Sequence, residues 1–306
     1  MKKVIMGGFA SLAAIGIAVG TYLFETAPST HLSSKTETPQ QQKSPPENED
    51  TLQSIGSNGP IGYALSDELH ITYDEGRHWS RVPIGIEALF AGEYNGQENE
   101  LIEQSFFLSE DLAAFLYVEG DRDGDQRVKL LYSLDQGHTW NDADIGGLIA
   151  PRFRKVDFLN EDDGYVVYTG ERTMSSEATK VYMTHDSGET WTEVSHPDHY
   201  RLLYDGNFID EKTGFLSYGI LNPEEPDLYV TQDAGQSWVP ARIEIPDEYH
   251  LIFTTAETPY VEGHDLVLLV NQGSSGDYKG GKVKGKFISK DNGLSWSFQQ
   301  VVDADE

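Results

Sequence analysis

An eight-residue pattern occurs five times in the 306-residue chain and constrains its fold more than any other feature. The pattern is Ser or Thr, any residue, Asp, any residue, Gly, two further residues and Trp, and it stands at residues 72–79, 133–140, 184–191, 231–238 and 289–296. With average residue usage it should occur at a given position with a probability on the order of 10⁻⁵. All five tryptophans lie in these octets, so the repeat indicates a repeated architecture and not one local site.

The fixed residues of each octet suit a turn between two strands. The Asp can accept hydrogen bonds from backbone N–H groups of its own turn, the Gly supplies a positive φ, and the Trp begins the return strand, where its ring fills space between sheets and its N–H seeks a carbonyl. One carboxylate per isolated turn makes no cluster, so we expect a structural and not a metal or catalytic role. These residues are Asp74, Gly76, Trp79, Asp135, Gly137, Trp140, Asp186, Gly188, Trp191, Asp233, Gly235, Trp238, Asp291, Gly293 and Trp296.

The octet resembles the Asp-box, or BNR repeat, of the β-propellers found in sialidases, sortilin-type receptors and the photosystem II assembly factor family. The resemblance covers nearly all of residues 55–302 and implies that each box joins the third and fourth strands of a four-stranded blade. The box aspartates lie 61, 51, 47 and 58 residues apart, which suits four short strands with loops. We therefore expect residues 55–306 to form an all-β, five-bladed β-propeller of four-stranded antiparallel blades.

Individual strands can be predicted within the periods. Turn residues separate short apolar-alternating or β-rich runs at 155–159, 164–169, 180–184 and 191–194 in the third period, and at 207–209, 214–218, 228–231 and from 238 onward in the fourth. Only residues 53–66 are available for the two inner strands of the first blade, which leaves the closure between blades one and five open.

The N-terminal 54 residues divide into two further segments. Lys2 and Lys3 precede an uncharged stretch over residues 4–24, which is long enough to span a bilayer and also fits a secretory signal peptide with a small-residue cleavage site at Ala18 and Gly20. Both interpretations place the following chain outside the cytoplasm. Residues 25–54 lack aromatic residues and are rich in Pro and polar residues, which predicts a disordered stalk. The expected location is the cell membrane in a single pass, or secretion if residues 1–24 are cleaved.

Charge and cysteine content exclude several classes of protein. The formal charge is −29, of which residues 55–306 carry −28, so the chain repels nucleic acid and anionic lipid. The absence of Cys excludes disulfides, thiolate nucleophiles and Cys metal sites. We expect no cofactor and no nucleic-acid partner, and contact with the membrane only through residues 4–24.

Eight connections should form the face opposite the boxes, where a propeller collects ligand-binding residues. They are residues 84–102, 145–152, 195–206 and 240–250 between blades, and 119–127, 170–179, 220–227 and 271–282 between second and third strands. Three groups of side chains in them suggest chemistry.

The first group is Asp121, Asp123 and Asp125, whose alternate carboxylates suit Ca²⁺. However, Gln126 and Tyr132 stand where an EF-type loop has Gly and Glu, and a polar hairpin tip between strands at 115–118 and 128–132 is the simpler interpretation.

The second group is His196 and His199, followed by Tyr200 and Arg201, which could bind a metal or support acid–base chemistry. No third ligand is identifiable, so a solvated loop is the alternative.

The third group is Arg152 and Arg154, which could hold a ligand carboxylate. They could equally offset the neighbouring acids Asp157, Glu161 and Asp162.

The resemblance to sialidases does not extend to the sequence motifs of their active site. Sialidases carry a Phe-Arg-Ile-Pro-type motif before the first boxes, an arginine triad, and a Tyr/Glu pair with an Asp acid, but no Arg occurs between residues 51 and 72. The leading hypothesis is therefore an exported, membrane-tethered, non-catalytic module that binds a protein or a cell-envelope glycan. The alternative is a sialidase-like or other glycoside hydrolase, and a third interpretation, which the sequence does not separate from the binding module, is a passive structural or assembly factor.

Overall fold

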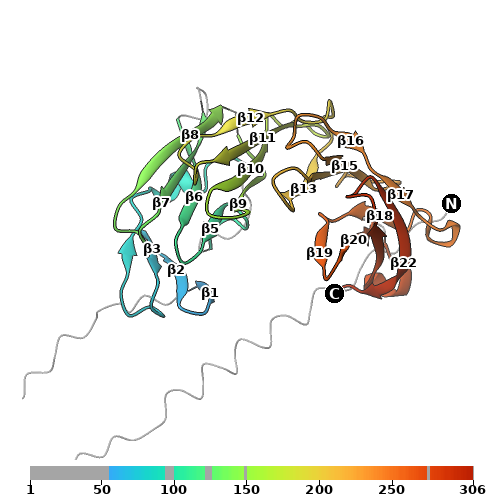
Figure 1. Cartoon of the computed structure of the whole chain (residues 1–306), viewed down its shortest axis with the longest axis horizontal. Helices are drawn as coiled ribbons and strands as arrows, with labels where there is room; N and C mark the ends of the chain where they lie inside the picture. Colours follow the sequence, from blue (N-terminus) through green and yellow to red (C-terminus); the bar gives the residue numbers. More distant parts are fainter. Residues whose placement is uncertain (1–54, 94–99, 121–125, 148–149, 274–275, 306) are drawn as a thin grey trace, which may run out of the picture. The chain divides into compact units, whose positions relative to one another are not determined.

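The computed structural model describes residues 55–93, 100–120, 126–147, 150–273 and 276–305 (Figure 1). The predicted anchor and stalk lie outside the described residues, as do Asp121, Asp123 and Asp125. Across the described part of the chain, we find no helix with the length and apolarity needed to cross a bilayer.

The described chain is almost entirely β-structure, arranged in five successive sheets. The first sheet contains β1 (Ile55–Asn58), β2 (Ile61–Leu65), β3 (Leu69–Thr72) and β4 (Ser80–Arg81). The second contains β5 (Phe106–Leu108), β6 (Ala113–Glu119), β7 (Arg127–Ser133) and β8 (Asn141–Gly147). The third contains β9 (Arg154–Phe158), β10 (Asp163–Gly170), β11 (Ala178–His185) and β12 (Thr192–Val194).

The fourth sheet contains β13 (Leu203–Phe208), β14 (Gly214–Tyr218), β15 (Asp227–Thr231) and β16 (Val239–Pro240). In each of these four sheets the strands pair antiparallel in chain order. The helices are one turn long: α1 (Ile86–Leu89), η1 (Asp247–Tyr249) and η2 (Tyr278–Gly281). An all-β chain of sequential antiparallel four-stranded sheets is consistent with a β-propeller.

The fifth sheet departs from the expected four strands, because six of the described strands belong to it. It contains β17 (Arg242–Glu244), β18 (Phe253–Ala256), β19 (Tyr260–Glu262), β20 (Asp265–Gln272), β21 (Val283–Ser289) and β22 (Ser295–Asp303). β17 pairs parallel to β22, so the predicted loop at 240–250 is in part a strand. The side chains of β17 alternate as in a strand with one buried face: Ile243 packs against the core, whereas Arg242 and Glu244 on either side of it are exposed.

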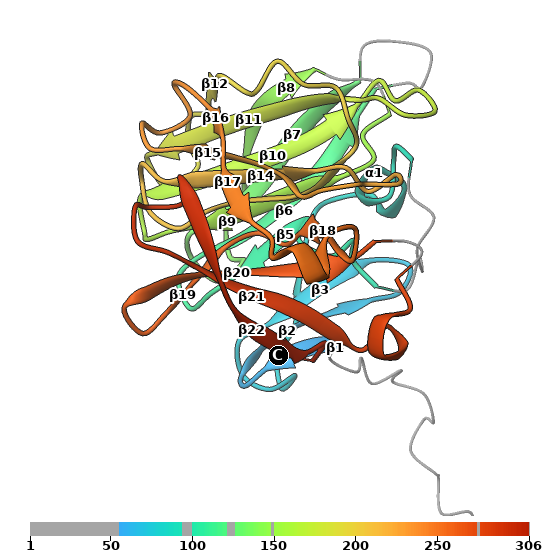
Figure 2. The ribbon, with the colours of Figure 1, turned by 90° about the vertical axis from the view of Figure 1, so that its right-hand side faces the viewer.

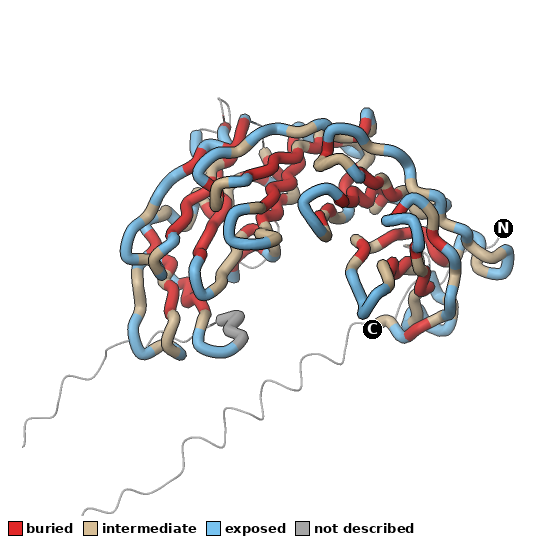
Figure 3. Tube along the Cα trace, viewed as in Figure 1, coloured by how far each residue is buried: buried red, intermediate tan, exposed pale blue. Residues whose placement is uncertain are grey.

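Four apolar clusters fill the spaces between consecutive sheets. Strand alternation produces them: Phe115 of β6 packs toward the first sheet, whereas its neighbour Leu116 packs toward the third. Phe215 and Leu216 of β14 divide in the same way between the fifth and third sheets. Figure 3 shows the buried residues running along the strands and the exposed ones at the turns. Among the described residues, none of the four clusters joins the first sheet to the fifth.

The topology separates the turns into two groups at opposite ends of the strands. In the first four sheets the octet connects the third and fourth strands, and the turn between the first and second strands lies at the same end; in the fifth sheet the octet connects β21 to β22. Ser187 N–H of the third box donates to Asp162 O at 2.9 Å, which joins these two turns. The connections between sheets, and those between second and third strands, therefore lie at the other end. In Figure 2, β19 lies toward one end of the strands and α1 toward the other.

Candidate functional site

In all five octets the aspartate accepts hydrogen bonds from its own turn. Its Oδ1 accepts the backbone N–H of the residue four positions later at 2.8–2.9 Å and the hydroxyl of the first octet residue at 2.8–3.0 Å. That hydroxyl accepts the N–H of the box glycine at 2.8–3.1 Å. The carboxylates thus have local partners, and in the described part of the chain no three His, Asp or Glu are grouped to hold a metal ion.

These hydrogen-bond donors stabilise the charged form of the box aspartates and so lower their pKa values. The His78 side chain, followed by its backbone N–H, lowers the pKa of Asp74 to about 2. The Thr139 hydroxyl, followed by its backbone N–H, lowers the pKa of Asp135 to about 2 as well.

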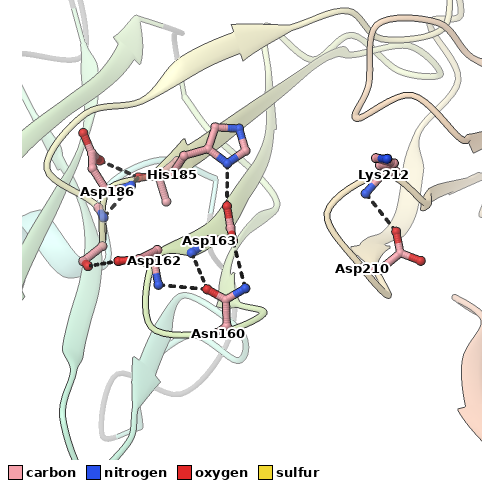
Figure 4. A network of polar contacts seen from close by, with 10 residues as sticks. Asn160, Asp162, Asp163, His185, Asp186, Asp210 and Lys212 are labelled. Carbon is pink, nitrogen blue, oxygen red and sulfur yellow. Dashed lines mark hydrogen bonds and ion pairs between the residues drawn. The ribbon is translucent and has the colours of Figure 1, made fainter.

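The turns at this end of the strands contain further acids with local partners. Figure 4 shows Asn160, whose Oδ1 accepts the N–H groups of Asp162 and Asp163 at 2.9 and 2.8 Å. His185 Nδ1 lies 2.5 Å from Asp163 Oδ1. These groups stabilise a turn, and we assign no site to them.

Four of the box tryptophans pack between consecutive sheets. Trp140, Trp191, Trp238 and Trp296 each belong to a different one of the four clusters. The Nε1 atoms of Trp191, Trp238 and Trp296 donate to backbone carbonyls at 2.8–3.0 Å, as the sequence predicts. Trp140 differs, because its Nε1 is buried without a hydrogen-bond partner.

The histidine pair of the third-to-fourth-sheet connection does not form a shared site. His196 Nδ1 lies 2.9 Å from the Pro197 carbonyl oxygen. His199 Nε2 lies 2.9 Å from Asp227 Oδ2, without the alignment of a hydrogen bond, and its ring packs edge-on against Tyr218 at 4.8 Å between centroids. Residues 195–201 form the predicted loop, in which Tyr200 is exposed and the His199 ring is partly buried against the fourth sheet.

The two arginines singled out in the sequence have separate partners. Arg152 donates Nε and Nη2 to the Glu177 carboxylate at 2.8 and 2.7 Å, and the Glu177 side chain is 0% exposed. Arg154 is buried and donates to the carbonyls of Leu89 and Ala91, and loss of solvent lowers its pKa to about 10. Neither arginine pairs with Asp157, Glu161 or Asp162, although the sequence suggested that they could. Both side chains instead contact residues that are distant in the chain: Glu177 for Arg152, and Leu89 and Ala91 for Arg154.

The Arg152 pair has a counterpart in the next sheet. Arg201 stands two residues before β13, as Arg152 stands two before β9, and it donates to Asp227 at the start of β15 at 2.8 Å. The sequence carries this spacing, so a search for Arg followed about 25 residues later by a carboxylate could have found both pairs.

No free arginine triad exists among the described residues. Seven of their eight arginines pair with a carboxylate, and the eighth is Arg154, which contacts carbonyls. The arrangement that binds a sugar carboxylate in sialidases is thus missing from the part of the chain that the structure describes.

Three adjoining cavities form a groove at the end of the strands opposite the boxes, on the fourth and fifth sheets. The outer cavity, of about 440 Å³, is lined by residues that include Glu224, Glu225, Asp227, Arg242, His250 and Leu251. The middle cavity, of about 310 Å³, is lined by residues that include Asn222, Glu224, Leu251, Thr254, Asp277 and Tyr278. The inner cavity, of about 480 Å³, is lined by residues that include Tyr204, Glu257, Asn271, Gln272, Gly273 and Val283.

Shared lining residues show that these cavities adjoin one another. Glu224 and Leu251 line both the outer and the middle cavity, and Gln272 and Gly273 line both the middle and the inner one. Most of the lining comes from the predicted connections at 220–227, 240–250 and 271–282.

Leu251 is the most unusual residue of the groove. Its side chain is 61% exposed, and its φ of 61° is a left-handed conformation that residues with a Cβ seldom adopt. Sequence reasoning missed Leu251 and Thr254, which lie just beyond the predicted connection at 240–250. No turn residue in the sequence signals the conformation of Leu251.

Comparisons with known proteins give only distant structural likenesses. No protein-family model and no curated protein matches the chain. Among solved structures, a GH74 xyloglucanase from Xanthomonas campestris matches with a TM-score of 0.36 and 14% identity, over 79% of this chain and 43% of that one. The NanB sialidase from Streptococcus pneumoniae matches with a TM-score of 0.35 and 13% identity, over 68% and 32%. An ulvan lyase matches with a TM-score of 0.41 and 12% identity, over 84% and 72%. Likenesses at this level assign neither an activity nor a substrate to this chain.

Proposed function

We propose that the chain is a binding module and that its ligand lies in the groove on the fourth and fifth sheets. In this proposal the five sheets are the blades of a β-propeller, and residues 1–24 attach it to a membrane with the β-structure outside the cytoplasm. The observation that carries the proposal is the row of three adjoining cavities, with exposed Leu251 lining both the outer and the middle one. Concave sites with a few converging polar groups are the usual places where proteins bind ligands.

The charges of the groove select against anionic ligands. Glu224, Glu225, Asp227, Glu257 and Asp277 line it, and Arg242 is already paired with Glu244 at 3.0 Å. A sugar carboxylate would meet repulsion from these acids, because the groove offers it no unpaired arginine among the described residues. The ligand is therefore a neutral or positively charged protein segment or cell-envelope glycan.

Hydrolysis of a neutral glycan is the second candidate. The outer and middle cavities contain several carboxylates, and glycoside hydrolases use two carboxyl groups about 5–9.5 Å apart as acid and as base or nucleophile. Under this proposal Glu224 and one of its neighbours would supply these groups.

A ligand titration with two matched variants tests both candidates. The full-length chain is titrated with neutral oligosaccharides and with basic and acidic peptides, and released reducing sugar is measured in parallel. The groove variant is Glu224→Gln with Leu251→Gly, and the control is Glu110→Gln with Leu134→Ser, which changes exposed residues near the boxes. Binding lost only in the groove variant supports the binding module. Sugar release lost only in the groove variant supports the hydrolase, and equal behaviour of the two variants contradicts both.

A further inference from the structure

We propose that the occupant of the groove is an extended, positively charged peptide segment of another protein, with an apolar side chain packed on Leu251. This inference rests on the binding function proposed above and specifies its ligand. Four features of the groove support it: unpaired acids, a strained apolar residue, an unsatisfied buried hydroxyl and length.

Three acids of the outer and middle cavities have no paired cation in the described part of the chain, whereas Asp227 of the outer cavity is paired with Arg201. Within the described residues, the carboxylates of Glu224, Glu225 and Asp277 form no ion pair, whereas most lysines and arginines elsewhere are paired with acids. Lys279, close to Asp277 in the chain, lies instead over the Tyr278 ring at 5.5 Å from its centroid. Unpaired acids around a concave surface focus a negative potential that attracts cationic groups.

Leu251 supplies an apolar contact at the junction of the outer and middle cavities. A side chain that is 61% exposed gains little from burial, and its left-handed φ is unfavourable for any residue with a Cβ. Backbone strain of this kind tends to concentrate at binding sites, where the neighbouring structure enforces it. A ligand with an apolar group would cover Leu251 and gain from doing so.

Thr254 lines the middle cavity and carries a hydroxyl that is unpaired among the described residues and that Gly273 covers. Its side chain is 1% exposed, and its Oγ1 has no hydrogen-bond partner among the described residues. The hydroxyl is packed close to Gly273, which lines the same cavity, since a Cβ placed on Gly273 would lie 2.6 Å from Oγ1. Buried polar atoms are normally paired, so this hydroxyl is suited to a backbone carbonyl or N–H of a ligand after a small movement of Gly273.

A peptide satisfies these groups together better than a glycan does. Its backbone provides donors and acceptors for Thr254, its Lys or Arg side chains pair with the acids, and an apolar side chain packs on Leu251. A neutral glycan brings no charge for Glu224, Glu225 and Asp277. The three adjoining cavities also favour an extended ligand over a compact one.

Fluorescence anisotropy with synthetic peptides tests the inference on the full-length chain. The probe is a labelled octapeptide with the sequence Lys-Leu-Lys-Gly-Lys-Leu-Lys-Gly. One matched peptide has every Lys replaced by Glu, and the other has every Leu replaced by Ser. We expect the lysine–leucine peptide to bind, with its affinity falling about tenfold between 50 and 500 mM NaCl because salt screens the ion pairs. We expect both matched peptides to bind at least about fivefold more weakly.

Variants locate the bound peptide. The double change Glu224→Gln and Glu225→Gln should weaken binding about tenfold, whereas Glu110→Gln should leave it unchanged. Leu251→Gly should weaken binding about fivefold without lowering the melting temperature, because glycine accepts the φ of 61°. A loss of binding in this variant therefore cannot be attributed to unfolding.

Each outcome decides between the inference and the proposed function. Equal binding of the lysine and glutamate peptides, or binding insensitive to the groove variants, overturns the inference. If cellohexaose binds in a groove-dependent manner and the peptide does not, the occupant is a glycan and the binding function stands. If neither probe depends on the groove, the inference and the proposed function both fail.

Discussion

Gly235 of the fourth box packs against Val194 at the end of β12 in the third sheet. A Cβ on Gly235 would lie 2.6 Å from Val194 Cγ2, and the φ of Gly235 is 76°. Next to this contact, Ser195 Oγ donates to the Gly235 carbonyl at 2.6 Å, and Trp238 Nε1 donates to the Ser195 carbonyl at 2.8 Å. The box glycine is therefore required both for its conformation and for the close approach of two sheets.

Replacing Gly235 with Ala should destabilise the protein more than the backbone conformation alone explains. We expect Gly235→Ala to cost about 2–4 kcal/mol of unfolding free energy, because strain at positive φ adds to overpacking against Val194. Gly263→Ala is the control, since Gly263 has a φ of 64° and nothing within 4 Å of its Cβ position, and it should cost about 1 kcal/mol. Urea unfolding measures both, and equal costs would show that the contact with Val194 contributes nothing.

The hydrogen bonds of the box tryptophans can be tested by a matched pair. Trp191→Phe removes the bond to the Gly188 carbonyl, whereas Trp140→Phe removes an N–H that has no partner. Both changes lose similar ring area, so Trp191→Phe should cost about 1 kcal/mol more. Thermal unfolding of the two variants gives the difference. A larger cost for Trp140→Phe would contradict the partners assigned here.

The aspartates of the boxes should make the protein acid-sensitive in a defined pH range. Their pKa values are lowered in the folded state, to about 2 for Asp74 and Asp135, against about 4 in an unfolded chain. A lowered pKa stabilises the folded state above about pH 4, and this stabilisation is lost as the pH falls toward 2. The melting temperature should therefore fall across that range, and Asp135→Asn should make the fall shallower. An unchanged slope in Asp135→Asn would contradict the assignment.

The buried pair of Arg152 and Glu177 should contribute more to stability than an exposed pair. Glu177→Gln leaves the partly buried guanidinium without its counter-charge and should cost about 2–4 kcal/mol. Glu75→Gln is the control, because Glu75 and Arg77 are 66% and 73% exposed at the side chain, and it should cost less than about 0.5 kcal/mol. Chemical denaturation compares them, and similar costs would mean that Glu177 does not neutralise Arg152.

The strand content was predictable because its signals are local. The runs predicted at 164–169, 180–184 and 214–218 lie within or coincide with β10, β11 and β14, since alternation and flanking turn residues determine them. The run predicted at 207–209 begins too late. β13 starts at Leu203, and an irregular register between Leu203 and Asp205 interrupts the alternation.

The candidate site was less predictable because tertiary contacts determine it. The sequence located the connections that line the groove, but the pairing of β17 with β22 and the conformation of Leu251 depend on segments far apart in the chain. The Glu177 partner of Arg152 lies 25 residues away, across a strand pair, whereas the sequence suggested its near neighbours. Side-chain partners of this kind follow from sheet register, which composition and spacing do not determine.

Hydrogen–deuterium exchange tests the location of the ligand site most directly. The full-length chain is compared with and without the lysine–leucine octapeptide at saturating concentration. We expect slower exchange in residues 220–228 and 250–256, which line the groove, and no change at the five octets. Slower exchange confined to the octets or to the first three sheets would contradict a ligand site on the fourth and fifth sheets.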